Sequence, residues 1–240
     1  MATKVMVNIP DERPYAVRIG AGILAGSGSH VKQACGIEGA GRALIVTDSN
    51  VAPLYRDAAR ASLAEAGMRV SDIVVPAGEE TKSLEVLGEI WEAMAQLGLG
   101  RDCVVVALGG GVVGDLAGFA GATYMRGVKV VQVPTTLLAM VDSSVGGKTA
   151  INLEAGKNLV GAFKQPSYVC ADTDTLATLP EREWRCGCAE VAKSAVIDSD
   201  EFFFWMADHA AAIAAREAEA VSEAIARCVV FKADVVAMDK

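Results

Sequence analysis

One stretch of the sequence, residues 133–163, concentrates side chains that bind small polar molecules. Its background is mostly small or apolar, and its polar members include Thr135, Thr136, Asp142, Lys148, Lys157 and Asn158. Both lysines directly follow a glycine. Glycine lets a backbone approach a ligand closely, and a lysine ammonium is a compact positive charge. The pattern therefore predicts an enzyme that binds a phosphorylated or carboxylated small molecule.

A second motif is a glycine turn. Gly109, Gly111 and Gly114 form a G-x-G-x-x-G pattern after an apolar run at 103–108. Such glycines permit a tight turn, and the amides at the start of the following helix face a pyrophosphate. The acidic residue expected about 20 positions later is missing, so a ribose partner would have to come from Asp48, at the end of another predicted strand. The alternative is a turn whose glycines serve packing alone.

The segment Gly146–Thr149 also invites comparison with a nucleotide-binding P-loop, G-x-x-x-x-G-K-[ST]. The first glycine of that pattern would fall on Asp142, whose carboxylate would repel phosphates. A nucleoside triphosphatase is therefore disfavoured. Taken singly, Lys148 and Lys157 could be solvated surface lysines, and Thr135 could simply end a strand. Paired with glycines and with each other, the lysines favour the ligand-binding interpretation.

A third candidate lies near the C-terminus. Glu190 and Lys193 are three residues apart and project from one face of a predicted helix. They form either a surface ion pair or a site in which Glu190 is a carboxylate ligand to a metal. His30 and His209 are isolated in the sequence and are read as a loop residue and a helix-surface residue.

The elements that position these residues alternate between strand and helix. We expect an α/β fold with a mostly parallel sheet, helices on both of its faces and an N-terminal β-hairpin, followed by the first helices of an all-α domain. The expected strands are Val5–Ile9, Tyr15–Ile19, 43–47, 70–75, 103–108 and 128–133. The expected helices are 50–67 with Asn50 as cap, one from Leu84 to about Gly98, one after Gly109, 183–197, 200–215 and 217–238. The predicted domains are 1–178 and 179–240.

Composition excludes some classes of function. The 240 residues carry a formal charge of -8, and no basic face is visible, so nucleic acid is not an expected partner. The most apolar run, 103–113, is interrupted by glycines and is too short to span a bilayer. The N-terminus lacks the apolar core of a signal peptide. We therefore expect a cytoplasmic protein whose six cysteines are reduced.

Taken together, the motifs identify the chain by its resemblance to the 3-dehydroquinate synthase family, over essentially its whole length. The segments that carry the resemblance are Pro76–Glu79 with Lys82, Gly109–Asp115, Tyr124–Gly127, Pro134–Thr136, Val141–Asn152, Gly156–Asn158 and Gly187–Lys193. The resemblance implies a Rossmann-like domain over 1–178 that binds NAD. It also implies conversion of 3-deoxy-D-arabino-heptulosonate 7-phosphate to 3-dehydroquinate and phosphate, with transient oxidation by NAD, in the shikimate pathway. Polyol dehydrogenases that use NAD and a metal share the broad fold and are the alternative.

The resemblance also assigns residues. The implied substrate contacts are Arg126, Asp142, Lys148, Asn158 and Lys193. The implied NAD contacts are Asp48, Glu79, Lys82, Gly111, Val112, Val113, Gly114, Asp115, Thr135, Thr136, Lys148, Lys157, Thr175, Leu176, Ala177 and Thr178. The implied metal, zinc with cobalt as second choice, is held in the family by one glutamate, which Glu190 matches, and by two histidines, which neither His30 nor His209 matches. We therefore expect a fragment, inactive alone, whose histidines follow Lys240, and a homodimer.

Overall fold

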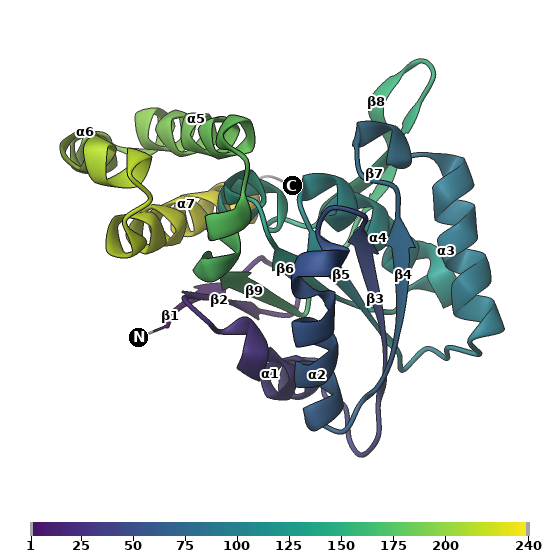
Figure 1. Cartoon of the computed structure of the whole chain (residues 1–240). Coiled ribbons are helices and arrows are strands. Elements are labelled where there is room, and N and C mark those ends of the chain that lie inside the picture. The colour runs from purple at the N-terminus through teal and green to yellow at the C-terminus, as the bar shows by residue number, and fades with distance from the viewer. Residues whose placement is uncertain (1, 239–240) are drawn as a thin grey trace.

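The computed structural model describes residues 2–238 and shows a seven-stranded sheet covered by helices (Figure 1). The strand order is β1-β2-β9-β6-β5-β3-β4, and every neighbouring pair is parallel except β1 with β2. The strands are β1 Thr3–Val7, β2 Tyr15–Gly20, β3 Arg42–Asp48, β4 Arg69–Val75, β5 Val104–Gly109, β6 Lys129–Pro134 and β9 Tyr168–Asp172. The central strands are buried along their whole length, as expected of parallel strands covered on both faces.

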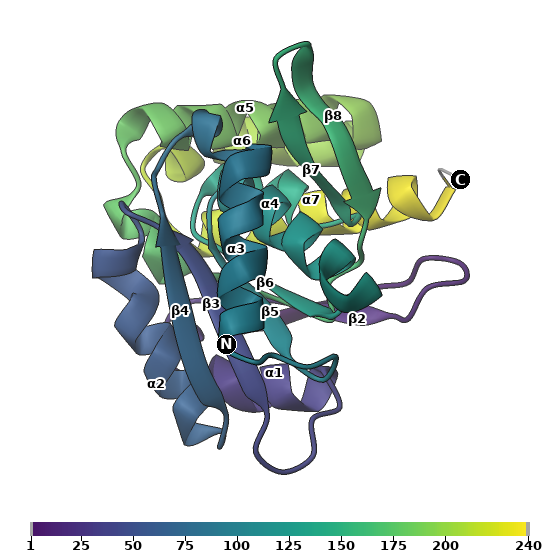
Figure 2. The ribbon, with the colours of Figure 1, turned by 90° about the vertical axis from the view of Figure 1, so that its right-hand side faces the viewer.

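Two further strands, β7 (Lys148–Leu153) and β8 (Gly156–Phe163), form an antiparallel hairpin outside this sheet. The hairpin projects from the sheet in both views (Figure 2). Most of β8 is exposed, including the apolar side chains of Leu159 and Phe163. One side of the hairpin packs against helix α4, where Thr149 contacts the position of Gly118.

The helices cover the sheet in three groups. Helices α1 and α2 pack on one face, and α3 and α4 pack on the other. Helices α5, α6 and α7 lie over the β1-β2-β9 end of the sheet. The bounds are α1 Ser27–Ala34, α2 Asp57–Glu65, α3 Leu84–Gln96, α4 Gly111–Thr123, α5 Glu181–Asp198, α6 Asp200–Ala214 and α7 Ala218–Met238, with short helical segments η1 Leu24–Gly26, η2 Ala52–Arg56, η3 Glu79–Thr81, η4 Tyr124–Arg126, η5 Ala139–Ser143 and η6 Thr173–Thr178.

Strand periodicity explains how one sequence serves two faces. Leu44 and Val46 of β3 pack against α3 and α4, whereas Ala43 and Ile45 pack against α1 and α2. Successive side chains of a strand point to opposite faces, so each strand contributes to both cores. Each fully buried Leu or Ile contributes about 1.5–3 kcal/mol relative to an exposed position, and this burial holds the strand ends in place.

The predicted architecture is confirmed, with specific errors. The prediction that Asn50 caps a helix over 50–67 is wrong: Asp48 Oδ1 accepts the amides of Asn50 and Val51, and the π-helical segment η2 precedes α2. The first strand ends at Val7 instead of Ile9, since the turn to β2 begins earlier. Strands β7, β8 and β9 were not predicted. All six cysteines are free. Among the described residues, no helix has both the length and the apolarity needed to cross a membrane.

Candidate functional site

The topology creates a crevice at the carboxyl edge of the sheet. Strand β3 has β4 on one side and β5 on the other, so the order of the chain reverses between β3 and β5. In open α/β sheets, ligands bind outside the carboxyl ends of the strands at such a point. Asp48 ends β3 and Gly109 ends β5, and the preceding residues, Thr47 and Leu108, are register partners. The predicted ribose partner therefore lies on the strand next to the glycine turn.

The glycine turn opens α4 without a side-chain cap. Gly110 is the N-cap residue and Gly111 the first residue of the helix. The first amides of a helix have no intrahelical acceptor, so those at 111–113 can bind an anion. A Cβ added at Gly110 would lie 3.0 Å from Thr136 Cγ2, and one added at Gly111 would lie 3.2 Å from Ser143 Oγ. The glycines therefore serve close packing as well.

Other predicted contacts lie in loops after β6 and β9. Thr135 is buried and donates its amide to Gly109 O, and Thr136 Oγ1 accepts the amide of Ala139. In η6, the side chains of Thr175 and Leu176 are buried. Tyr55 Oη binds both Thr175 O and Thr178 Oγ1, which joins η2 to η6. Thr175 and Leu176 are almost fully buried, so the surface that η6 offers to a cofactor comes from Ala177 and Thr178.

A buried polar cluster connects three elements at this edge. Lys82 follows η3 and is only 4% exposed, and its Nζ donates to Asp115 Oδ2 of α4 at 2.6 Å and to Asn158 Oδ1 of β8. Burial is the largest influence on the pKa of Asp115 and raises it, while Lys82 opposes that shift and the charges of Glu79 and Asp142 add to it. Through Lys82, this cluster connects α4, the end of η3 and the hairpin.

Two members of this cluster, Asp115 and Asn158, line a cavity of about 320 Å³. The lining residues are Asp115, Lys148, Thr149, Ala150, Asn158, Gly161, Ala162 and Phe163. Lys148 is exposed at the start of β7, and Lys157 lies 3.7 Å from Glu79 Oε1 at the hairpin turn. The two lysine-bearing elements predicted from the sequence thus belong to one hairpin beside one cavity.

A second cluster lies between α5, α7 and η5. Lys232 Nζ of α7 donates to Asp142 Oδ1 at 2.7 Å, and Lys193 pairs with Glu190 on α5. The hydrogen bond that Lys193 donates to Glu190, helped by the charge of Asp142, raises the pKa of Lys193. Asp142 influences the pKa of both Asp115 and Lys193, so it lies between the two clusters. Sequence reasoning missed Lys232, although it falls at helical spacing on the stripe of buried Ile225, Cys228 and Val229, an unusual place for a lysine.

The predicted metal ligand is Glu190, and the described residues do not complete a metal site around it. Over residues 2–238, no three His, Cys, Asp or Glu side chains come together in a way that could hold a metal ion. Glu190 has Lys193 as its ion-pair partner, while His209 stacks on Trp205 of α6. A catalytic zinc site needs three protein ligands, so these residues do not fit a metal site by themselves.

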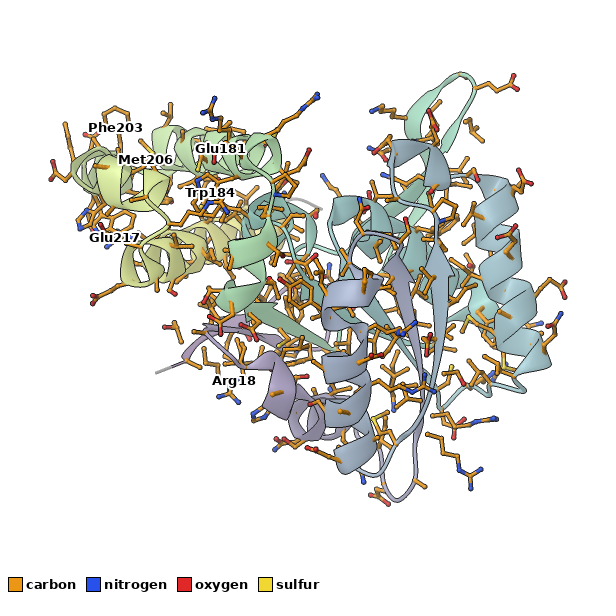
Figure 3. The ribbon with its side chains drawn as sticks, viewed as in Figure 1. Arg18, Glu181, Trp184, Phe203, Met206 and Glu217 are labelled. Atoms are coloured by element: carbon orange, nitrogen blue, oxygen red, sulfur yellow. The ribbon has the colours of Figure 1, made fainter. Side chains whose placement is uncertain are left out.

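Arg126 is not among the residues that line the cavity. It is exposed, three residues after the C-terminus of α4. A larger groove, of about 880 Å³, lies between the β1-β2 end of the sheet and helices α6 and α7. Glu217 marks it in Figure 3, at the outer end of the helical part. Its lining has Glu217, Glu219 and Glu223 and no lysine or arginine, so it would repel an anionic ligand.

Comparison with known proteins agrees with the motifs. A family model described as 3-dehydroquinate synthase N-terminal matches residues 72–186, and one described as 3-dehydroquinate synthase C-terminal matches residues 187–240. The chain belongs to the 3-dehydroquinate synthase family. The 3-dehydroquinate synthase of Acidithiobacillus ferrooxidans is 51% identical over 229 residues, which cover 95% of this chain. The chain spans 62% of the length of that relative.

Solved structures show the same relationship for the fold. A 2-deoxy-scyllo-inosose synthase complexed with carbaglucose-6-phosphate, NAD+ and Co2+ superposes with a TM-score of 0.89 at 28% identity, covering 99% of this chain and 63% of that one. The 2-epi-5-epi-valiolone synthase of Streptomyces hygroscopicus subsp. jinggangensis, with NAD+ and Zn2+ bound, gives 0.82 at 32% identity, covering 94% and 62%. The mostly parallel Rossmann-like fold of the family is thereby confirmed for this chain.

Proposed function

We propose that this chain forms the NAD-binding part and one wall of the substrate site of a 3-dehydroquinate synthase. That enzyme converts 3-deoxy-D-arabino-heptulosonate 7-phosphate to 3-dehydroquinate and phosphate in aromatic amino acid biosynthesis. The observation that carries the proposal is the Lys82–Asp115–Asn158 cluster, of which Asp115 and Asn158 line one cavity with Lys148. Asp115 lies on α4, the helix that follows β5 at the crevice. The family match favours this function over the polyol dehydrogenase alternative.

The described residues fit NAD. The uncapped start of α4 would hold the pyrophosphate, and Asp48 on the neighbouring strand would accept from a ribose hydroxyl. The loop with Glu79 and Lys82 and the backbone of η6 would border the rest of the NAD molecule. When bound, NAD supplies reversible hydride transfer. The protein residues orient it and exclude water at the closed polar cluster.

The cationic residues would hold the acidic substrate. Lys148 and Lys157 offer positive charge to phosphate or carboxylate oxygens, and Asn158 offers an amide. Because the pKa of Lys193 is raised, its ammonium keeps its proton at neutral pH and serves as a cation instead of a base. Lys232, held by Asp142, adds a further cation between the two clusters. Arg126 remains a predicted contact without support from its position.

We also propose that this chain does not turn over substrate alone, because the residues that the structure describes, 2–238, do not complete a metal site around Glu190. Phosphate release from the substrate, assayed with NAD+ and Zn2+, should stay at background; sustained turnover would refute this. The division into domains at 178/179, a homodimeric state and a cytoplasmic location belong to the same proposal. The two family models meet at 186/187, within α5, and sedimentation of the purified chain tests the oligomeric state.

Calorimetric titration with NAD+ tests the cofactor part directly. We expect one saturable site per chain and no saturable binding of ATP. Binding of ATP in preference to NAD+ would favour the P-loop interpretation and overturn the proposal. A Lys148→Met variant should retain NAD+ binding more fully than it retains affinity for the phosphorylated substrate, because its ammonium faces the cavity.

A further inference from the structure

The tip of the β7-β8 hairpin contains an irregularity in register. Ile151 pairs with Val160 and Leu153 pairs with Gly156, so one residue of β7, Asn152, lies opposite three residues of β8. The extra residues of β8 have no partners in β7 and form a bulge. Bulges commonly change the direction of a side chain next to a functional site. Here the bulge turns Asn158 toward Lys82.

Asn158 has a left-handed backbone conformation with φ of 57°. Asparagine tolerates that conformation better than most residues, but the position still needs support from its surroundings. The support comes from Asn152, whose Oδ1 accepts the Asn158 amide at 2.9 Å. Without that acceptor, the amide at the bulge would lose its partner.

Asn152 also binds the opposite wall. Its Nδ2 donates to Glu79 Oε1 at 2.9 Å, and its amide donates to Lys82 O at 2.7 Å. One half-buried side chain therefore joins the Glu79–Lys82 loop to the bulge that carries Lys157 and Asn158. The side chain of Asn152 does not line the cavity, whereas that of Asn158 does.

We propose that Asn152 is a positioning residue of this site. Its amide group fixes Glu79 on one side and the Asn158 backbone on the other, so that Lys82, Asn158 and Glu79 hold their arrangement before a ligand arrives. This inference rests on the proposed function, since the arrangement is taken to serve NAD and the acidic substrate. An amide is required because one end must donate to a carboxylate while the other accepts from a backbone N–H.

Two substitutions separate the two ends of the side chain. N152A removes both hydrogen bonds. N152D keeps an acceptor for the Asn158 amide but replaces the donor to Glu79 with a second carboxylate. The matched control is E154Q, at an exposed position in the turn of the same hairpin. Three readouts apply to each chain: the Kd for NAD+, the hydrogen exchange of the Asn158 amide by NMR, and the midpoint of thermal unfolding.

We expect N152A to weaken NAD+ binding about tenfold, the equivalent of one to two hydrogen bonds, and to remove protection of the Asn158 amide. N152D should keep that protection and weaken binding about threefold, and E154Q should match the unmutated chain. The midpoint of thermal unfolding should fall by less than about 3 °C in each variant, because the hairpin tip lies outside the core.

Several results would overturn the proposal. They are NAD+ binding by N152A within about twofold of the unmutated chain, unchanged protection of the Asn158 amide in N152A, or a midpoint lowered by about 8 °C or more in both variants, which would mark a merely structural role. If the unmutated chain binds NAD+ and N152A binds it equally well, only the positioning role is overturned. Absence of NAD+ binding by the unmutated chain overturns the proposed function, and the positioning role with it.

Discussion

The two polar clusters of this chain differ in how completely they are assembled. At the sheet edge, Lys82 is 4% exposed and binds partners from two other elements. In the helical part, Lys193 and Glu190 form a pair within one helix, with side chains 49% and 27% exposed. The first arrangement costs desolvation and exists only because the fold fixes it, whereas the second forms on any helix with this spacing. The sheet-edge cluster, which we propose serves the cofactor, is therefore preorganised, whereas the Glu190–Lys193 pair, which we propose lies at the metal side, is not.

The largest expected effect comes from removing the buried cation. Lys82→Met leaves the Asp115 carboxylate without its partner and should lower the free energy of unfolding by about 3 kcal/mol, measured in urea. Lys157→Met is the matched control, since Lys157 is 72% exposed and 3.7 Å from Glu79, and it should cost less than about 0.5 kcal/mol. Equal losses in the two variants would remove the distinction between the clusters.

The pH dependence of stability should carry the signature of Asp115. Its pKa in the folded chain lies above 3.8, so the folded state holds this proton more tightly than the unfolded state. The free energy of unfolding should therefore fall as the pH rises from 3.8 to the raised pKa, and Asp115→Asn should lack this component. Urea unfolding at several pH values measures it. A difference between the two chains that grows in the opposite direction would contradict the assigned shift.

A smaller effect is expected at the other ion pair of the second cluster, between α7 and η5. Lys232 and Asp142 are 24% and 31% exposed, so solvent screens their 2.7 Å contact only in part. Lys232→Met should cost about 1 kcal/mol in urea unfolding and leave the Kd for NAD+ unchanged. A loss as large as that of Lys82→Met would show that the helical part is as preorganised as the sheet edge.

The smallest effect is expected at the candidate metal ligand. Glu190→Gln should change stability by a few tenths of a kcal/mol, because an (i, i+3) pair contributes about that much. Zinc titration should detect no tight site that depends on Glu190. Tight zinc binding abolished by Glu190→Gln would instead show that these residues assemble a metal site.

The sequence predicted the sheet edge well because its signals are local. Buried runs followed by Asp48, Gly109 or Thr135 placed chemistry at strand ends, and parallel strands bring such ends to one edge. It was harder to predict which residues form the polar cluster. Nothing local shows that Lys82 and Asn158, 76 residues apart, share a hydrogen bond, or that a two-stranded hairpin outside the sheet brings them together.

The remaining errors have similar causes. Asn50 has the residue type of a helix cap, but the N-cap residue of η2 is Val51, which has no side-chain cap, and Asp48 instead accepts the amides of the turn before it. Strand β9 was overlooked because its five residues follow a loop without a helical crossover of its own. Arg126 was assigned by resemblance alone, and its place at the far end of α4 gives that assignment no local support.

The most direct test of the central claim is hydrogen exchange of the chain with and without NAD+, read residue by residue. If NAD+ binds at the sheet edge, exchange should slow in NAD+ at residues 78–82 and 110–114, where the polar cluster and the start of α4 meet. Slowing confined to the acidic groove between the β1-β2 end of the sheet and helices α6 and α7, or no slowing at a saturating concentration, would contradict this binding site.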